Sequence, residues 1–240
     1  MNIDLLELKN QNFIKPELIH RGYAVYAIRM TLLSAVEELK SQIGGKVLDL
    51  GCGIMPYKEF LQEKGTIVEY IGIDLEQSDY HNTIRPDMFW DGMKIPLEDN
   101  SCDWIIATEF LEHYHDTEAI LLEMNRVLKQ GGKLFFTVPC VWVLHEVPYD
   151  EHRFTPFSLT KYFEKTGFSE INIKPLGGID MSLAIMYGLW IDHSGIKGFR
   201  KRFFRKIFKP MFKYLLKKDS KSSSFENGNL PSGLYGFIQK

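Results

Sequence analysis

The stretch VLDLGCGIMPYKEFL, residues 47–61, contains an apolar run, a turn with two glycines and the start of a predicted helix. A glycine turn after a buried strand can hold dinucleotides, phosphates or adenosyl groups. Gly51 and Gly53 let the backbone turn sharply and approach a ligand closely. Pro56 stands where dinucleotide-binding turns have a third glycine, which disfavours a pyrophosphate. No Lys-Ser or Lys-Thr pair follows, which excludes a P-loop.

Two acidic residues flank this turn. Asp49 lies two residues before the first glycine, at the carboxyl end of the predicted strand, where its charge would repel a phosphate and attract a cation. Asp74 ends the next apolar run, and an acid there can accept hydrogen bonds from both hydroxyls of a ribose. The pair favours a positively charged adenosyl ligand. NAD also has a free ribose, and each acid could instead cap its loop.

Strands and helices alternate along most of the chain. The predicted strands cover residues 46–51, 68–74, 103–108, 131–139, 168–177 and 232–240, and the predicted helices cover 17–42, 117–129 and 158–166. Pro56 is expected in the first turn of another helix, and Ser158 is expected to cap the last one. This order predicts an α/β fold with a doubly wound, mostly parallel sheet and helices on both faces.

The formal charge of −2 hides an uneven distribution. Residues 197–218 hold ten Lys and Arg and no acid, so the rest of the chain sums to −12. On a helix, one apolar stripe contains Phe199, Phe203, Ile207, Met211 and Leu215, and its neighbour contains Phe204, Phe208, Phe212 and Leu216. We expect Pro210 to start a second helical piece. Such a surface suits the anionic cytoplasmic face of a membrane. Docking on the protein core stays open, and nucleic acid is not expected.

Cysteine usage and hydrophobicity indicate the compartment. Cys52, Cys102 and Cys140 lie far apart and are odd in number, which argues against a disulfide framework and for a cytoplasmic protein. The N-terminal residues contain early acids and no long apolar run, so neither a signal peptide nor a membrane span is predicted.

Four blocks occur in an order that resembles the class I S-adenosylmethionine-dependent methyltransferases of the methyltransferase type 11 group. They are VLDLGCG, GIDLE, MKIPLEDNSCDWIIATEFLEHYHD and LLEMNRVLKQGGKLFFTVP. The resemblance implies a Rossmann-like sheet of seven strands, with an antiparallel last strand inserted beside the fifth. The resemblance covers about residues 45–175 and extends weakly to the final strand. From its length we expect a single domain over residues 1–240, with a helical lead-in (1–44), a core (45–178), a helical, basic insertion (179–230) and a final strand (231–240).

The same resemblance assigns residues to the cofactor S-adenosylmethionine, whose net positive charge agrees with the argument from Asp49. Asp49, Gly51 and Gly53 would line the methionine part, with Cys52 between them, while Asp74 would hold the ribose. Leu75 would pack on the adenine and Asp91 would meet its amino group; Glu109 and Phe110 would close the pocket. Two residues depart from the family pattern, namely Met55 in place of a small residue and Cys102 in place of Phe.

The segment after the fifth predicted strand, CVWVLHEVPYDEHRFTPFSL, is dense in polar residues. We expect it to lie over the transferred methyl group, with His145 or His152 as a candidate base and with Tyr149 and Arg153 contacting the acceptor. These side chains could instead make only loop hydrogen bonds. His113 and His115 do not share a helix face, so no metal is predicted.

The most consistent function is S-adenosylmethionine-dependent methylation, on oxygen, of a small molecule, glycan or lipid-linked sugar. PYDEHRFTPFSLTKYFEKTGF, residues 148–168, resembles methyltransferases encoded among bacterial glycan and lipopolysaccharide assembly enzymes. Two alternatives stay open, a nicotinamide-dependent oxidoreductase and a non-catalytic adenosyl-binding protein at a membrane surface. The expected location is the cytoplasm, with peripheral attachment to the inner membrane face through residues 197–218.

Overall fold

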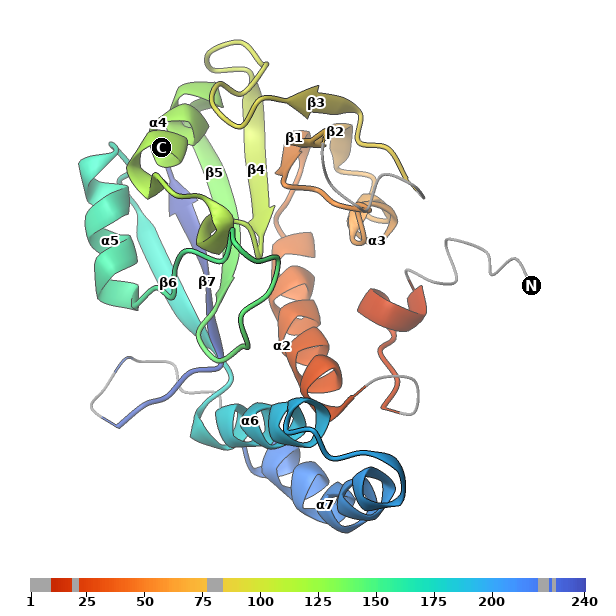
Figure 1. The fold of residues 1–240 in the computed structure, drawn as a ribbon. Coiled ribbons are helices and arrows are strands. Elements are labelled where there is room, and N and C mark those ends of the chain that lie inside the picture. The colour runs from red at the N-terminus through yellow and green to blue at the C-terminus, as the bar shows by residue number, and fades with distance from the viewer. Residues whose placement is uncertain (1–9, 19–21, 77–83, 220–224, 226–227) are drawn as a thin grey trace. The chain divides into compact units, whose positions relative to one another are not determined.

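The protein, taken from a computed structural model, is described over residues 10–18, 22–76, 84–219, 225 and 228–240. Its elements follow one another as Figure 1 shows. They are η1 (Asn10–Ile14), α2 (Tyr23–Lys40), β1 (Gly45–Leu50), α3 (Lys58–Gln62), β2 (Ile67–Leu75), β3 (Met88–Trp90), β4 (Cys102–Thr108), η3 (Leu111–His113), α4 (Thr117–Val127), β5 (Leu128–Pro139), α5 (Pro156–Lys165), β6 (Ile171–Leu176), α6 (Ile179–His193), α7 (Gly198–Lys218) and β7 (Gly233–Gln239).

The strands form one seven-stranded sheet in the order β3-β2-β1-β4-β5-β7-β6. The first five strands are parallel neighbours, with Leu50 opposite Ile73. Strand β7 runs against β5, because Lys240 N donates to the Gly132 carbonyl at one end of the pair and Cys140 N donates to the Ser232 carbonyl at the other. The predicted fold is therefore confirmed, including the antiparallel last strand inserted beside the fifth.

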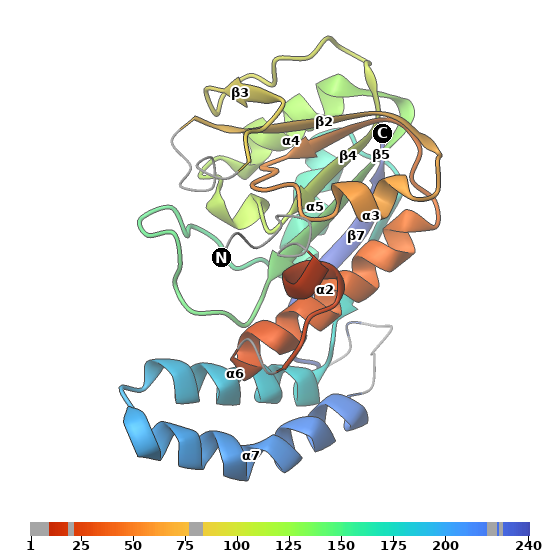
Figure 2. The same cartoon turned by 90° about the vertical axis from the view of Figure 1, so that its right-hand side faces the viewer.

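Two consecutive phenylalanines of β5 show how the sheet is covered. Phe136 contacts Phe163 of α5, whereas Phe135 faces the opposite way and contacts Phe237 of β7. On that second face Tyr235 donates to Glu38, near the end of α2. Figures 1 and 2 show α4 and α5 together on one side of the sheet. Alternate side chains of a strand point to opposite faces, so one buried strand supplies both halves of the core.

By compactness the chain divides into two units. One contains residues up to 35, 139–144 and 175–234, and the other contains residues 36–138, 145–174 and 235–240. In the first unit, α6 and α7 pack through aromatic pairs, with Trp190 against Phe204 and Tyr187 against Phe208. The second unit holds nearly all of the sheet and every candidate site residue. Whether the chain folds as one domain stays a prediction.

Several predicted element boundaries are wrong. Helix α2 begins at Tyr23 rather than at Glu17, and α3 begins at Lys58, so Pro56 lies before the helix and not in its first turn. Helix α5 is capped by Thr155, which accepts from Ser158 N while Ser158 Oγ accepts from Thr155 N. Ser158 is thus the third helical residue of a capping box and not the cap itself.

Two further differences concern a helix and a strand. Helix α7 continues through Pro210, although a second helical piece was expected there. The aromatic residues before Pro210 contact α6, and Phe212 beyond it is buried against Tyr23, so packing holds both halves in line. The three-residue strand β3 was not predicted, because it is short and pairs only with β2. Residues 220–224 and 226–227 of the predicted polar loop lie outside the described part.

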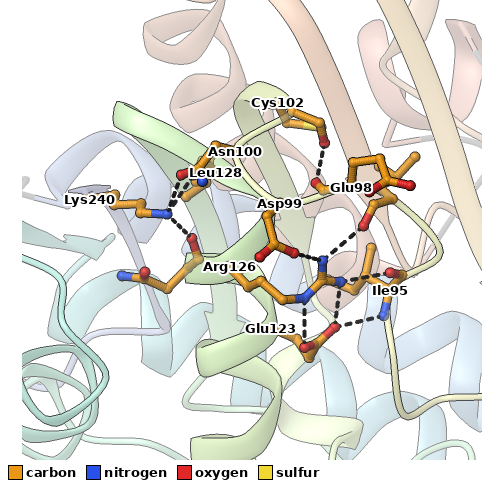
Figure 3. A network of polar contacts seen from close by, with 12 residues as sticks. Ile95, Glu98, Asp99, Asn100, Cys102, Glu123, Arg126, Leu128 and Lys240 are labelled. Carbon is orange, nitrogen blue, oxygen red and sulfur yellow. Dashed lines mark hydrogen bonds and ion pairs between the residues drawn. The ribbon is translucent and has the colours of Figure 1, made fainter.

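A charge network fixes the segment between β3 and β4 (Figure 3). Arg126 of α4 donates to the carbonyl oxygens of Ile95 and Leu97 and to the carboxylates of Asp99 and Glu123. These bonds raise the pKa of Arg126 and lower that of Glu123. A guanidinium with several acceptors of this kind explains how the acidic, proline-containing loop between β3 and β4 is held in place.

Candidate functional site

The glycine loop, residues 51–55, takes its path from backbone geometry that glycine favours. Gly51 and Gly53 have φ of 69° and 50°. Gly51 N donates to the Ile73 carbonyl of β2, which anchors the start of the loop to the neighbouring strand. A β-carbon on Gly51 would lie 2.4 Å from Cδ2 of Phe110, whereas one on Gly53 would meet nothing within 4 Å. The ring of Phe110 therefore approaches the backbone at Gly51, and Gly53 stays open.

Met55 fits this loop by turning inward. Its φ is 49°, in the left-handed region that is costly for a residue with a side chain. Its side chain is 5% exposed and lies over Gly72 of β2, where an added β-carbon would be 2.6 Å from the Met55 sulfur. Cys52 packs at the same place, with its Sγ 3.0 Å from that position. The side chains of Met55 and Cys52 thus fill the core, and the loop offers its backbone to a ligand.

Asp49 is a buried carboxylate at the end of β1. It is 4% exposed and accepts a hydrogen bond from the Tyr70 hydroxyl at 2.6 Å. Burial raises the pKa of Asp49 to about 7, the Tyr70 hydrogen bond opposes this rise, and the charge of Asp74 adds to it. A nearby cation would favour the ionised form and lower this pKa. Tyr70 was not predicted; its position in β2, opposite Val47, gives no sequence signal of the bond.

Asp74 bonds to the glycine loop with one carboxylate oxygen and to the backbone of its own strand with the other. Oδ2 accepts from Gly53 N at 2.9 Å, and Oδ1 accepts from Leu75 N at 2.8 Å. The side chain of Leu75 is 47% exposed and lies 3.3 Å from where a β-carbon of Gly92 would be. The geometry therefore brings together the residues that were expected to hold a ribose and an adenine.

The remaining predicted cofactor residues lie beyond the carboxyl ends of β3 and β4. Asp91 Oδ1 accepts from Met93 N and Lys94 N, and these bonds lower the pKa of Asp91. Glu109 has a φ of 50°, and Thr137 of β5 holds it from two sides. The Glu109 N–H donates to the Thr137 carbonyl at 3.0 Å, and the Thr137 hydroxyl donates to the Glu109 carboxylate at 2.8 Å.

The polar loop, residues 145–153, contains one linked set of side chains. Arg153 donates to both carboxylate oxygens of Asp150, at 2.5 and 2.8 Å, and lowers the pKa of Asp150 to about 2. Asp150 also lies 3.2 Å from Nδ1 of His145. Tyr149 is 64% exposed. His152 is set apart from this group, since its ring lies against Phe154 and its Nε2 is buried with no hydrogen-bond partner among the described residues.

Turn η3 places two further polar groups beside this loop. Glu112 is fully buried, and burial raises its pKa well above the usual range. Its backbone carbonyl accepts from Glu151 N and His152 N, so the turn and the loop are joined. Nδ1 of His113 lies 3.1 Å from the Tyr149 carbonyl, and the rings of His113 and His145 meet edge to face at 4.7 Å. Sequence reasoning missed Glu112, because its burial depends on a loop far along the chain.

Comparison with known proteins identifies the class. Residues 48–136 match the family described as Methyltransferase domain. The chain is similar to the demethylmenaquinone methyltransferase of Staphylococcus saprophyticus, with 26% identity over 184 residues, 60% of this chain and 78% of the relative. It is also similar to the ubiquinone biosynthesis O-methyltransferase of Hahella chejuensis, with 26% identity over 159 residues, 57% of this chain and 62% of the relative.

A solved structure extends the likeness to the whole fold. The S-adenosylmethionine-dependent methyltransferase from Archaeoglobus fulgidus aligns over 99% of this chain and 100% of its own, with a TM-score of 0.57 and 16% identity. At that identity the match concerns the fold alone. Together with the domain match and the curated relatives, it defines a class I S-adenosylmethionine-dependent methyltransferase. The protein is thus an enzyme whose cofactor is S-adenosylmethionine.

The residues at the sheet edge fit this cofactor. It carries a sulfonium and an ammonium group, and the buried carboxylate of Asp49 lies beside the glycine loop that would receive them. Phe110 packs against the backbone at Gly51, where a β-carbon would clash with its ring, and the backbone at Gly53 stays open. Asp74 and the exposed Leu75 supply a hydrogen-bond acceptor and an apolar surface on the next strand.

Among the helices of the described residues, none has the length and apolar character that a membrane span requires.

Proposed function

We propose that this methyltransferase acts on a hydroxyl group of a small molecule, glycan or lipid-linked sugar. The observation that carries the proposal is His145 in the polar loop, whose Nδ1 lies 3.2 Å from Asp150. A carboxylate at Nδ1 orients an imidazole and leaves Nε2 able to accept a proton, which an attacking hydroxyl must lose. When bound, S-adenosylmethionine supplies an electrophilic methyl group.

The cofactor would be held by residues in or directly after four adjacent strands, β1 to β4. We assign the methionine part to Asp49 and to the backbone of residues 51–53, including Cys52, whose side chain faces the core. We assign the adenosyl part to Asp74, Leu75 and Asp91. Glu109 and Phe110 would close the pocket near the sulfonium. The bonds from Thr137 to Glu109 and from Gly53 to Asp74 support this assignment, because they hold the two acids before any ligand arrives.

His145 suits the role of a base better than His152. The side chain of His145 is 27% exposed and Asp150 orients it, whereas Nε2 of His152 is buried. Tyr149 is exposed and available to an acceptor. Arg153 already makes two bonds to Asp150, so it would act on the acceptor mainly by fixing the loop. The relative named for ubiquinone biosynthesis is an O-methyltransferase, which supports the reaction class and leaves the acceptor unnamed.

The test is release of S-adenosylhomocysteine with a panel of hydroxyl acceptors that includes free sugars, lipid-linked sugars and phenols. We expect turnover with at least one hydroxyl compound and about a 100-fold loss of kcat in His145→Asn. His152→Asn serves as the matched control and should keep kcat within about threefold. Turnover only with amine or carbon acceptors would contradict the proposal, and so would an equal loss in both variants.

We further propose that α7 attaches the enzyme to an anionic membrane surface. Four members of its first apolar stripe, Phe199, Phe203, Ile207 and Met211, are 49–76% exposed. Helix α6 adds a stripe of its own, since Ile179, Leu183, Met186 and Trp190 are 43–58% exposed. The second stripe of α7 packs inside its own unit, with Phe212 buried. Exposed aromatic residues beside cations suit a lipid headgroup layer.

The cations of α7 are mostly available to such a surface. Among the described residues, Lys201 and Arg205 pair with Asp192 and Lys218 pairs with Asp180, and no other cation of residues 197–218 has an acidic partner within 4 Å. A liposome co-sedimentation assay provides the test. We expect binding to phosphatidylglycerol vesicles that falls at least tenfold when Lys206, Lys209, Lys213 and Lys217 become Gln. No binding, or binding unchanged in this variant, would refute the attachment.

A further inference from the structure

A second group of polar side chains lies outside the residues assigned to the cofactor. Glu112, His113 and His145 each offer a ligand atom, and these atoms lie within 4.8 Å of one another. Glu112 and His113 belong to the turn after β4, and His145 belongs to the loop after β5. Ligand atoms about 2.1 Å from a tetrahedral metal ion lie about 3.4 Å from one another, so the most distant pair would close by up to about 1.4 Å to complete a site.

Glu112 supplies an independent indication that the cluster has a ligand. The residue is 0% exposed, and neither carboxylate oxygen has a hydrogen-bond partner among the described residues. Nε2 of His113 lies 3.8 Å from Oε1, within the range of an ion pair but too far for a hydrogen bond. A buried carboxylate without partners is costly, and native structures normally satisfy it with hydrogen bonds or a metal ion.

Both imidazoles have an oxygen atom near Nδ1, which leaves Nε2 available as a ligand atom. Nδ1 of His113 lies 3.1 Å from the Tyr149 carbonyl, which can only accept, so Nδ1 carries the proton and Nε2 keeps its lone pair. Nδ1 of His145 lies 3.2 Å from Asp150, which Arg153 holds in place with two hydrogen bonds. A carbonyl or carboxylate behind Nδ1 is the usual outer support of a metal-bound histidine.

We propose that Glu112, His113 and His145 bind one divalent transition-metal ion of the Zn²⁺, Mn²⁺ or Co²⁺ type. Two imidazoles and one carboxylate favour such ions over Mg²⁺ and Ca²⁺, which prefer sites built of oxygen alone. Three protein ligands also leave coordination positions open.

The function of the ion rests on the proposed O-methylation. An ion with open positions would receive the acceptor oxygen and lower the pKa of its proton, and His145 would then act as a ligand rather than as the base. Metal binding itself does not depend on that reaction, so the two proposals can fail separately.

The experiment uses the full chain after treatment with a chelator. Co²⁺ is added and its visible absorption recorded, and Zn²⁺ binding is measured by isothermal titration. We expect one ion per chain, displacement of Co²⁺ by Zn²⁺ and at least about 100-fold weaker binding in His145→Ala. His115→Ala is the matched control, because His115 stacks on Tyr114 in the same segment and is not part of the cluster.

Glu112→Gln tests the buried carboxylate, with circular dichroism to show that the variant folds. We expect metal affinity to fall about tenfold or more, and the part-exposed His145 gives a second variant if Glu112→Gln does not fold. The proposal is wrong if the wild type binds neither ion, or if His145→Ala binds as tightly as His115→Ala. If the metal binds as expected but no hydroxyl acceptor is methylated, the proposed O-methylation is wrong and the proposed metal site still holds.

Discussion

The glycine loop and the polar loop follow strands of the same sheet but obtain their shapes differently. The glycine loop is set by backbone conformation and by contacts to β2, with Gly51 bonded to Ile73 and Met55 folded over Gly72. The polar loop is set by side chains that bond to each other and to the turn after β4. Backbone constraints appear in a sequence as glycines at fixed spacing, whereas a side-chain network appears only once distant segments are placed.

The largest expected effect concerns the glycine loop. Gly51→Ala should weaken S-adenosylmethionine binding by about 100-fold or more, because the new methyl group would displace Phe110 and strain a residue at φ 69°. Gly65→Ala is the control, with a φ of 70° and no atom within 4 Å of the added carbon. Isothermal titration measures both. Equal losses of cofactor affinity in the two variants would contradict a specific role of the contact between Gly51 and Phe110.

Asp49 should make the stability of the ligand-free protein fall as pH rises. Its folded pKa of about 7 lies above the unfolded value, so its contribution is fully present below about pH 4 and is lost as pH rises through about 7. The span amounts to at most about 4 kcal/mol. Urea unfolding of the wild type and Asp49→Asn from pH 4 to 8 measures it. Parallel stability curves for the two proteins would contradict a raised pKa.

The same residue links protonation to cofactor binding. A cation placed beside Asp49 lowers its pKa, so binding near pH 7 should release a fraction of a proton, and binding near pH 9 should release none. Titration calorimetry in buffers of different ionisation enthalpy reports the number of protons released. If Asp49→Asn released the same number of protons as the wild type on binding, Asp49 would not contact the cationic part of the ligand.

Asp150 provides the corresponding test for the polar loop, with the opposite sign. Its folded pKa of about 2 lies below the unfolded value, so its contribution is present above about pH 4 and is lost as pH falls toward 2. We expect about 1–2 kcal/mol, reduced by the partial exposure of Arg153. Asp150→Asn should remove this dependence in urea unfolding and leave cofactor affinity unchanged. A loss of cofactor affinity would show that the two loops are coupled.

The smallest expected effect lies at the end of the polar loop. Thr155→Ala removes the cap of α5 and should lower the free energy of unfolding by about 1 kcal/mol. Thr160→Ala, on the same helix, removes only a bond to the Pro156 carbonyl and should stay within about 0.5 kcal/mol. Thermal unfolding measures both. Equal effects would mean that the capping box does not hold this end of the loop.

These differences explain what the sequence could predict. Buried apolar runs, glycines and the acids at strand ends predicted the strands, the mostly parallel sheet and the glycine loop, because each signal is local. The place of the last strand beside the fifth came from the family resemblance. The expectations for Pro56 and Pro210 were wrong, because packing as well as proline geometry determines where a helix begins. Helix α3 begins only at Lys58, and α7 continues through Pro210, with Phe204 before it packed on Trp190 of α6. The cluster of His113 with His145 could not be predicted, since 32 residues separate them.

The carboxylate of Asp219 joins the two ends of the helical insertion, accepting from Gly178 N and Met181 N at 2.9 Å each. The first residues of α6 and the end of α7 therefore meet at one carboxylate, although Phe212 of α7 also packs on Tyr23 of α2. A change in the length or charge of the insertion needs no change in strand register, since insertions whose ends already meet are well tolerated. Under the proposed attachment through α7, a change in this segment would alter affinity for a membrane surface without altering the residues assigned to the cofactor.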